Sequence, residues 1–184
     1  ITNLSFYHSQ NLPKKHNHIK IKFSNFMIIY NDPRRFGFLK ILNNKKELKK
    51  YFQRSGPEAI SSKFNFKYIK YKFINKKKNI KNFLLDQNFV SGIGNIYANE
   101  ILFYSKINPL KIAKKLSNKE IGKLAKYSKL VLNLSIKFGG SSIRNFKNAK
   151  GISGLFQNNF KVYDRENKSG VRKNCKGKII KIFI

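Results

Sequence analysis

The sequence predicts an α+β fold in which a strand-rich beginning precedes a helical middle and a strand-like tail. Three observations support this prediction. Apolar and polar residues alternate over 18–23, the spacing of apolar residues becomes helical beyond Glu58, and alternation returns after Phe156. Separate runs of strands and helices are typical of α+β proteins. Because 41% of the residues are hydrophobic, we expect the chain to bury a core.

The first predicted element is an antiparallel hairpin. Residues 18–23 alternate, and 27–30 resume an extended run after a Ser-Asn turn. The proline in 31–33 then breaks the pattern, and 34–37 are expected to form a loop. A lysine-rich linker is predicted at 43–50.

The middle of the chain carries four further predicted elements, all helical, one of which follows the turn Gly92-Ile-Gly-Asn95 described below. Residues 64–73 and 80–86 are short candidates. The clearest helix begins at Ser117-Asn-Lys-Glu120, which has the spacing of a capping box. Its buried face is predicted to comprise Ile121, Leu124, Ala125, Ser128, Val131 and Leu132. Gly139-Gly140 is expected to end this helix.

The tail is predicted to hold two strands, because residues 160–163 and 178–183 alternate again. Cys175 is the only cysteine, which excludes a disulfide within the chain. No apolar run is long enough to cross a bilayer, and the N-terminus shows no signal-peptide pattern. We therefore expect a cytoplasmic location.

The charge of the chain favours a polyanionic partner. Lysine and arginine number 40 against 8 aspartates and glutamates, so the formal net charge is +32. Drift in composition can supply lysines, but it does not account for the scarcity of acids. Nucleic acid is therefore the favoured partner, with a merely solvated basic surface as the alternative. A membrane-surface protein fits less well, since the apolar runs are short and interrupted by lysine.

The turn Gly92-Ile-Gly-Asn95 precedes a predicted helix and forms a candidate anion site. Its glycines let the backbone approach an anion closely, and Asn95 stands where a helix takes its N-cap. The first N–H groups of that helix, at the positive end of its dipole, would point at the anion. Such a turn is unspecific when it occurs alone.

Several motifs, taken in their order along the chain, carry a resemblance to one family. They are Asp32-Pro-Arg-Arg-Phe-Gly37, Leu84-Leu-Asp-Gln87, Gly92-Ile-Gly-Asn-Ile-Tyr-Ala-Asn-Glu100, Gly139-Gly-Ser-Ser-Ile143 and Val162-Tyr163-x-Arg165. In this order they resemble the formamidopyrimidine-DNA glycosylases. The resemblance runs from about Lys15 to the C-terminus.

The resemblance implies a β-sandwich, a helix-two-turn-helix DNA-binding domain and a zinc finger built on a β-hairpin. Residues 1–56 would then be the C-terminal part of the β-sandwich catalytic domain, 57–150 the helix-two-turn-helix domain, and 151–184 the end of a lesion-covering loop with a truncated zinc finger. The implied activity is base-excision repair: removal of oxidised purines such as 8-oxoguanine and formamidopyrimidines, then cleavage of the abasic site. A monomer on damaged double-stranded DNA is expected, without a membrane partner.

The same resemblance assigns DNA contacts. Arg34 and Phe36, with Arg35 between them, would fill the gap left by an extruded base, since a ring can wedge into the stack and a guanidinium can pair with the orphaned base. Without the resemblance, a buried Phe36 and a solvated Arg34 are favoured. Phosphate contacts are implied for His16, Lys81, Asn95 and Tyr163. Ordinary roles as an N-cap or as surface residues are the alternatives for the last three.

Four residues are implied to lie near the extruded base. Glu100 would accept hydrogen bonds from a base edge, and pairing with a basic neighbour is the alternative. Gly140, Ser141 and Ser142 belong to a loop that would cover the flipped base, unless it is an ordinary connection between helices.

Two features of the family are missing from residues 1–184. Family members use an N-terminal proline as nucleophile beside a glutamate, whereas this chain starts with Ile1, so no catalytic residue is assigned and we expect an inactive fragment. Zinc is the implied cofactor, held by two Cys-x-x-Cys pairs. Here Arg172 stands at the first position of the first pair and Cys175 at the second. One thiolate is too few for a structural zinc site.

Two other functions remain open at this stage. The related endonuclease VIII type removes oxidised pyrimidines, but Asp32-Pro-Arg-Arg-Phe-Gly37 and the Gly139-Gly140 loop favour the purine enzyme. A non-catalytic helix-two-turn-helix protein that binds nucleic acid is the second alternative. The predicted hairpin and its Arg-Arg-Phe loop argue against it.

Overall fold

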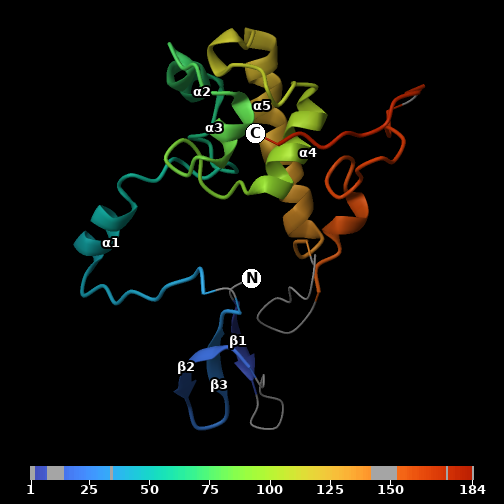
Figure 1. Ribbon diagram of the computed structural model, residues 1–184. Coiled ribbons are helices and arrows are strands. Elements are labelled where there is room, and N and C mark those ends of the chain that lie inside the picture. Colours follow the sequence, from blue (N-terminus) through green and yellow to red (C-terminus); the bar gives the residue numbers. More distant parts are fainter. Residues whose placement is uncertain (1–2, 8–14, 34, 142–152, 173, 184) are drawn as a thin grey trace. The chain divides into compact units, whose positions relative to one another are not determined.

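The computed structural model confirms the α+β architecture, and it divides into two compact units (Figure 1). The residues that it describes are 3–7, 15–33, 35–141, 153–172 and 174–183. Unit 1 comprises Ile1–Glu47 and Ser135–Asn158, and unit 2 comprises Leu48–Leu134 and Asn159–Ile184. Unit 1 contains the β-sheet, and unit 2 contains most of the helical residues and the C-terminal segment.

Unit 1 is built on a three-stranded antiparallel sheet with β3 at its centre. β2 (Asn17–Lys22) pairs with β3 (Met27–Asn31), which confirms the predicted hairpin. The turn between them is closed by the Phe23 N–H, which donates to the Phe26 carbonyl at 2.9 Å. β1 (Asn3–Tyr7) pairs with the other edge of β3 and was not predicted.

The lysine-rich segment predicted as a linker is instead a helix, α1 (Lys45–Phe52). The Asn44 side chain accepts the Glu47 N–H at 2.9 Å, and the Glu47 carboxylate accepts the Asn43 N–H at 3.0 Å. These bonds satisfy N–H groups at the helix start that have no partner within the helix. The prediction of a linker was wrong because the Asn44–Glu47 spacing was overlooked among the lysines.

Two short helices of unit 2 confirm the predictions to within two residues. α2 (Phe66–Phe73) and α3 (Ile80–Leu85) each follow an asparagine N-cap. The side chain of Asn65 accepts the Tyr68 N–H, and that of Asn79 accepts the Asn82 N–H. Ring centroids 5.3 to 5.8 Å apart define an aromatic core formed by Phe64, Phe73, Phe83 and Phe89.

The long predicted helix is α5 (Asn118–Lys137), and its capping box is confirmed. The Ser117 N–H donates to Glu120 at 2.7 Å, and the Glu120 N–H donates to the Ser117 hydroxyl at 3.3 Å. All six residues of its predicted face except Ala125 are buried. Beyond α5, Gly139 and Gly140 adopt φ of 71° and 86°, and their N–H groups bond back to carbonyls of the last helical turn.

The remaining helices are α4 (Asn95–Ser105) and two short 3₁₀ turns, η1 (Ala113–Lys115) and η2 (Phe156–Asn159). None of the helices in the described ranges is both long and apolar enough to span a membrane.

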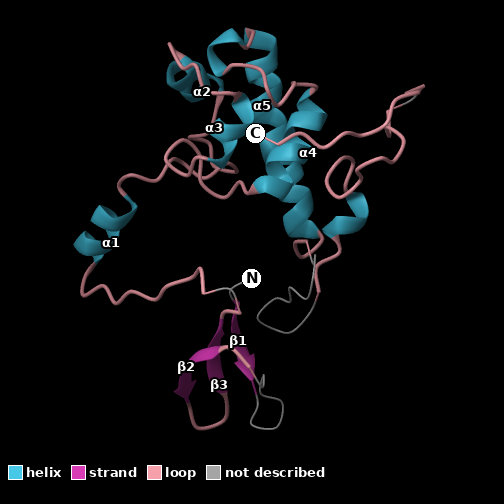
Figure 2. Cartoon of the chain, viewed as in Figure 1, coloured by secondary structure: helices cyan, strands magenta, loops and turns pink. Residues whose placement is uncertain are grey.

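The tail forms no regular strand in its described residues, so the prediction of strands at 160–163 and 178–183 was wrong (Figure 2). A short hairpin forms instead around an antiparallel bridge between Ser169 and Lys178. Its backbone bonds join Asn167 to Ile179, Ile179 to Lys168, and Gly170 to Gly177, each at 2.9 Å. Residues 161–163 direct their N–H groups to a side chain of α4, as described below.

Candidate nucleic-acid interface

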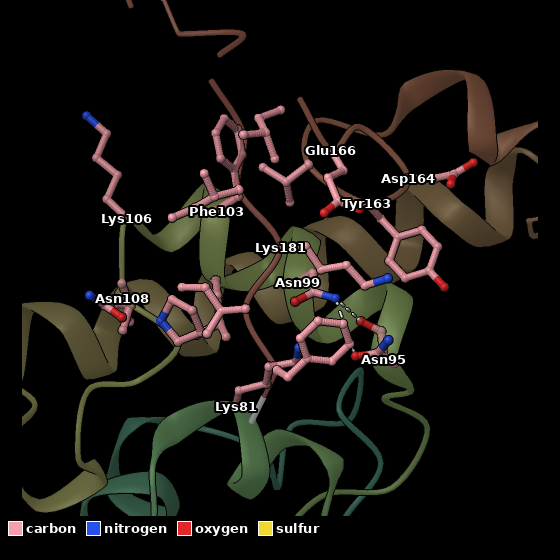
Figure 3. Close-up of a pocket in the computed structure, with 18 of the residues that line it drawn as sticks. Lys81, Asn95, Asn99, Phe103, Lys106, Asn108, Tyr163, Asp164, Glu166 and Lys181 are labelled. Atoms are coloured by element: carbon pink, nitrogen blue, oxygen red, sulfur yellow. Dashed lines mark hydrogen bonds between the residues drawn. The ribbon is translucent and has the colours of Figure 1, made fainter. Parts of the chain in front are cut away.

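A pocket of about 820 Å³ in unit 2 lies beside α4 and brings together three of the predicted phosphate contacts (Figure 3). Lys81 reaches it from α3, Asn95 from the first turn of α4, and Tyr163 from the C-terminal segment. These residues are separated by up to 82 positions in the sequence (163 − 81), so only the fold brings them to one place.

The turn that leads into α4 presents the start of the helix at this pocket. Gly92 has a φ of 87°, a left-handed conformation that favours glycine. The Gln87 side chain holds the turn by accepting the Gly92 N–H at 3.3 Å and donating to the Ile93 carbonyl at 3.1 Å. The N-cap is Gly94, which makes no side-chain cap bond. The first N–H groups of α4 are therefore not capped by the residue before them, at the positive end of the helix dipole.

Asn95 is the first helical residue and not the N-cap, so this part of the prediction was wrong. Its side-chain oxygen and its carbonyl accept hydrogen bonds from the Asn99 amide, at 3.4 and 2.8 Å. With that oxygen engaged, Asn95 presents its amide NH₂ group as a donor. Asn99 also lines the pocket, and its position one turn after Asn95 was a signal that sequence reasoning missed.

Among the charged side chains that line the pocket, basic ones outnumber acidic ones. Its basic side chains are Lys81, Lys106, Arg172 and Lys181, and its acidic side chains are Asp164 and Glu166. Sequence reasoning did not single out Lys106 or Lys181, because each stands among many lysines in the chain, and it considered Arg172 only at the position of an expected zinc cysteine. Together with the helix start, this surplus of cations suits the binding of an anion such as a phosphate.

Glu100 does not face the pocket, which corrects the expected role at a base edge. Its side chain is completely buried and its two carboxylate oxygens accept three backbone N–H groups, each at 2.9 Å. The donors are Lys161, Val162 and Tyr163. The described residues give Glu100 no salt bridge, so the alternative of a basic partner is not supported.

The position of Glu100 on α4 explains why it is buried. The apolar stripe of the helix consists of Ala98, Ile101 and Leu102, whereas Glu100 projects from the opposite side. The 161–163 segment covers that side and binds its carboxylate. Burial raises the pKa of the neighbouring Tyr104, and the charge of Glu100 raises it further. Glu100 thus ties the segment that carries Tyr163 to α4.

In unit 1, Asp32 organises the loop that carries Arg35 and Phe36. Asp32 is buried; its carboxylate accepts the Gly37 N–H at 2.7 Å, and its carbonyl accepts the Arg35 N–H at 3.3 Å. Phe36 is 76% exposed, so the alternative of a core phenylalanine was wrong. Arg34 lies outside the described residues.

His16 joins the same turn through its backbone. Its carbonyl accepts the Asp32 N–H at 3.1 Å, its φ is 65°, and its side chain is exposed. The His18 ring donates from Nε2 to the Asp32 carbonyl at 3.0 Å. The loop is thus bonded to the start of β2, and the expected phosphate contact of His16 stays a prediction.

Gly140 and Ser141 lie where the chain leaves α5, and Ser142 lies outside the described residues. The Gly140 carbonyl accepts the Phe156 N–H at 3.0 Å, and Ser141 forms an antiparallel bridge with Leu155. These bonds close the base of the loop that was expected to cover a flipped base. Its tip is not among the described residues, so that role stays a prediction.

The zinc expected from the family does not fit the residues present. Cys175 is exposed and its sulfur lies 3.9 Å from the Gly177 carbonyl. No group of three or more histidine, cysteine, aspartate or glutamate side chains that could hold a metal occurs in the part of the chain that the structure describes. A structural zinc needs four such ligands.

Comparisons with known proteins place these features in a family. The family model "Formamidopyrimidine-DNA glycosylase H2TH domain" matches residues 55–147. A formamidopyrimidine-DNA glycosylase of Wolbachia sp. subsp. Drosophila simulans is 42% identical over 163 residues, which cover 88% of this chain and 58% of the relative. One from Roseobacter denitrificans is 38% identical over 179 residues, which cover 96% and 63%. The chain thus spans about three fifths of the length of these relatives.

Solved structures agree with the sequence comparison. A Lactococcus lactis Fpg mutant in complex with Fapy-dG-containing DNA superposes with a TM-score of 0.90 at 32% identity, covering 100% of this chain and 67% of that one. The Lactococcus lactis Fpg in complex with DNA containing an abasic site also gives a TM-score of 0.90, at 31% identity with the same coverage. This chain therefore belongs to the formamidopyrimidine-DNA glycosylase family.

Proposed function

We propose that this chain is the DNA-binding part of a base-excision repair enzyme, a DNA glycosylase and abasic-site lyase that removes oxidised purines such as 8-oxoguanine and formamidopyrimidines. The observation that carries the proposal is the convergence of Lys81, Asn95 and Tyr163 on one basic pocket at the start of α4. The proposed partner is damaged double-stranded DNA, bound by a monomer. A cytoplasmic location and the division at residues 56 and 150 remain predictions.

In this proposal a backbone phosphate of the duplex sits against the first turn of α4. The exposed N–H groups and the Asn95 amide donate hydrogen bonds to its oxygens, and Lys81 neutralises its charge. Tyr163 adds a hydroxyl donor from the opposite wall. Such contacts set the position of the protein on the duplex without reading its sequence.

Unit 1 contributes the second half of the proposal. An enzyme that acts on a base within a duplex must extrude it, and a side chain that fills the vacated space stabilises the extruded state. Phe36 has the exposed ring that this task requires, on a loop fixed by Asp32. The net charge of +32 would attract the duplex over a longer range.

We expect the affinity for duplex DNA to fall steeply with salt, and Lys81→Ala to make that dependence shallower. Each phosphate contact releases condensed counterions, so loss of one contact lowers the magnitude of the log–log slope by about one. Fluorescence anisotropy with a labelled duplex across a salt series measures both slopes.

Lys67→Ala is the matched control, because Lys67 is an exposed lysine on α2 that does not line the pocket. It removes the same charge, and we expect its slope to match that of the unaltered chain. Equal slopes for all three proteins would contradict the assignment of Lys81, and an affinity that is indifferent to salt would contradict the proposed function.

Excision itself is proposed for the whole protein and not for residues 1–184. In the family chemistry, a proline amine attacks the sugar C1′, displaces the base and leaves a Schiff base that borohydride reduces to a stable amine. Residues 1–184 prepared as a separate polypeptide should give no trapped complex on 8-oxoguanine duplex. Trapping at an enzyme-like rate would show that another amine, such as a lysine, acts as nucleophile. Trapping on abasic DNA does not discriminate, because lysines can form imines with its aldehyde.

A further inference from the structure

The C-terminal segment of unit 2 forms one wall of the pocket, and two different contacts hold it on α4. Near its beginning, Glu100 accepts the N–H groups of 161–163. Further along, Arg172 contacts Phe103 in the last turn of α4. Arg172 belongs to the short hairpin that carries Ile179 to the pocket, because it lies between the bonded residues Gly170 and Gly177.

Arg172 contacts Phe103 in two ways at once. Its Nη2 donates a hydrogen bond to the Phe103 carbonyl at 3.1 Å, and its guanidinium carbon lies 4.7 Å from the centre of the Phe103 ring. A planar guanidinium suits both contacts, because it can lie against a ring while donating from its edge. The carbonyl belongs to the C-terminal turn of α4, where the helix dipole also favours a cation.

The contact between Arg172 and Phe103 lies at the position where the family resemblance predicts a zinc ligand. Arg172 occupies the position of the first expected zinc cysteine, and Cys175 is the only cysteine of the chain. A guanidinium remains protonated in proteins and offers no lone pair to a metal. Arg172 therefore cannot act as a metal ligand, and it contacts Phe103 of α4 instead.

We propose that Arg172 is an anchor that docks the C-terminal hairpin on α4 through Phe103 and that this docking needs no metal. The chemistry of the described residues is consistent with this, because they contain a single thiol, the exposed Cys175, and no group of three or more side chains that could hold a metal. Glu100 fixes one end of the segment and Arg172 fixes the hairpin, so the wall of the pocket is held at both places by protein contacts.

Amide hydrogen exchange of the 184-residue chain tests this anchor directly and requires no DNA. The reporters are the hairpin amides of Asn167, Gly170 and Ile179, which are bonded across the hairpin. Arg172→Ala should accelerate their exchange by about threefold to tenfold, the effect expected for one exposed cation–π contact with its hydrogen bond. Amides within α5 should be unaffected, which shows that the domain remains folded.

Arg54→Ala is the matched control, because Arg54 is an exposed arginine of the same unit outside the pocket lining. It should leave the hairpin amides unchanged. Phe103→Leu removes the ring but keeps the backbone carbonyl that accepts the Arg172 hydrogen bond, so it should accelerate exchange less than Arg172→Ala does. The double variant should exchange no faster than Arg172→Ala alone. Additive effects, or equal exchange in Arg172→Ala and Arg54→Ala, would overturn the anchor.

Chelation tests the second half of the proposal. Treatment of the unaltered chain with EDTA should leave exchange of the hairpin amides unchanged, and added zinc should give no further protection. Faster exchange after EDTA, reversed by zinc, would show that a metal holds the hairpin and would refute the proposal. Because neither arm measures DNA binding or catalysis, failure here is distinct from failure of the proposed function.

Discussion

Glu100→Ala is expected to lower the free energy of unfolding by about 2–4 kcal/mol, the largest stability change that we predict for a single residue of the chain. The substitution leaves the N–H groups of Lys161, Val162 and Tyr163 without the carboxylate that binds them. It also opens a cavity at a completely buried position. Water reaches part of this segment, which keeps the expected loss below the sum of three charged hydrogen bonds.

Urea denaturation of the purified chain measures this loss, and Glu100→Gln refines it. The amide keeps one acceptor oxygen but turns an NH₂ group toward a backbone donor, so we expect a smaller loss of about 1–2 kcal/mol. Glu58→Gln removes the same charge at an exposed position and should change stability very little. If Glu100→Ala were as stable as this control, the carboxylate would not be what holds the 161–163 segment.

The same substitution connects stability with DNA binding. Tyr163 belongs to the segment that Glu100 binds, and its side chain lines the pocket. Loss of the carboxylate should therefore weaken duplex binding even at urea concentrations where the chain is fully folded. A Tyr163→Phe variant separates the hydroxyl from the position of the segment, since it removes only the proposed donor.

Helices were predictable from the sequence where their starts carry local signals. The capping box at Ser117 and Glu120 forms as expected, and α2 and α3 begin next to their asparagine caps. The same type of signal at Asn44 and Glu47 was present but was overlooked within a run of lysines. Interactions over three or four residues are therefore readable from sequence when composition does not mask them.

The tail was not predictable because long-range partners decide its conformation. Alternation at 160–163 is typical of a strand, yet the N–H groups of 161–163 bond to Glu100, which lies 61 to 63 positions earlier in the chain. A ladder would need the same N–H groups, so the carboxylate and the strand exclude each other. Nothing local to residues 160–163 indicates this competition.

The candidate site was predictable in some of its members but not in its geometry. The motif order pointed to Lys81, Asn95 and Tyr163, and the structure brings all three to one pocket. The motif did not show whether the N-cap is Gly94 or Asn95, because the start of a helix cannot be assigned from sequence to within one residue. Glu100, in the same motif, is completely buried, and its carboxylate accepts the N–H groups of 161–163.

Phe36→Ala is expected to weaken binding to duplexes with an abasic site or a mismatch by about a few kcal/mol, the usual cost of an unstacked base step. Intact duplex should be affected much less, since only a distorted step admits the ring. The bonds of Asp32 to Gly37 and Arg35 do not involve the Phe36 side chain, so the loop backbone should persist in the variant. Urea denaturation should confirm that removal of a 76% exposed ring leaves the stability nearly unchanged.

The matched control for Phe36 is Tyr71→Ala, which removes a 71% exposed ring from α2 and should change neither affinity. Anisotropy titrations on paired duplexes that differ only at the abasic or mismatched position give the selectivity directly. Loss of a side chain that inserts into the base stack should lower the affinity for damaged duplex more than the affinity for intact duplex. Loss of a general contact should lower both affinities equally. Equal losses on damaged and intact DNA would therefore reduce Phe36 to a non-specific contact, and no loss on either would remove it from the interface.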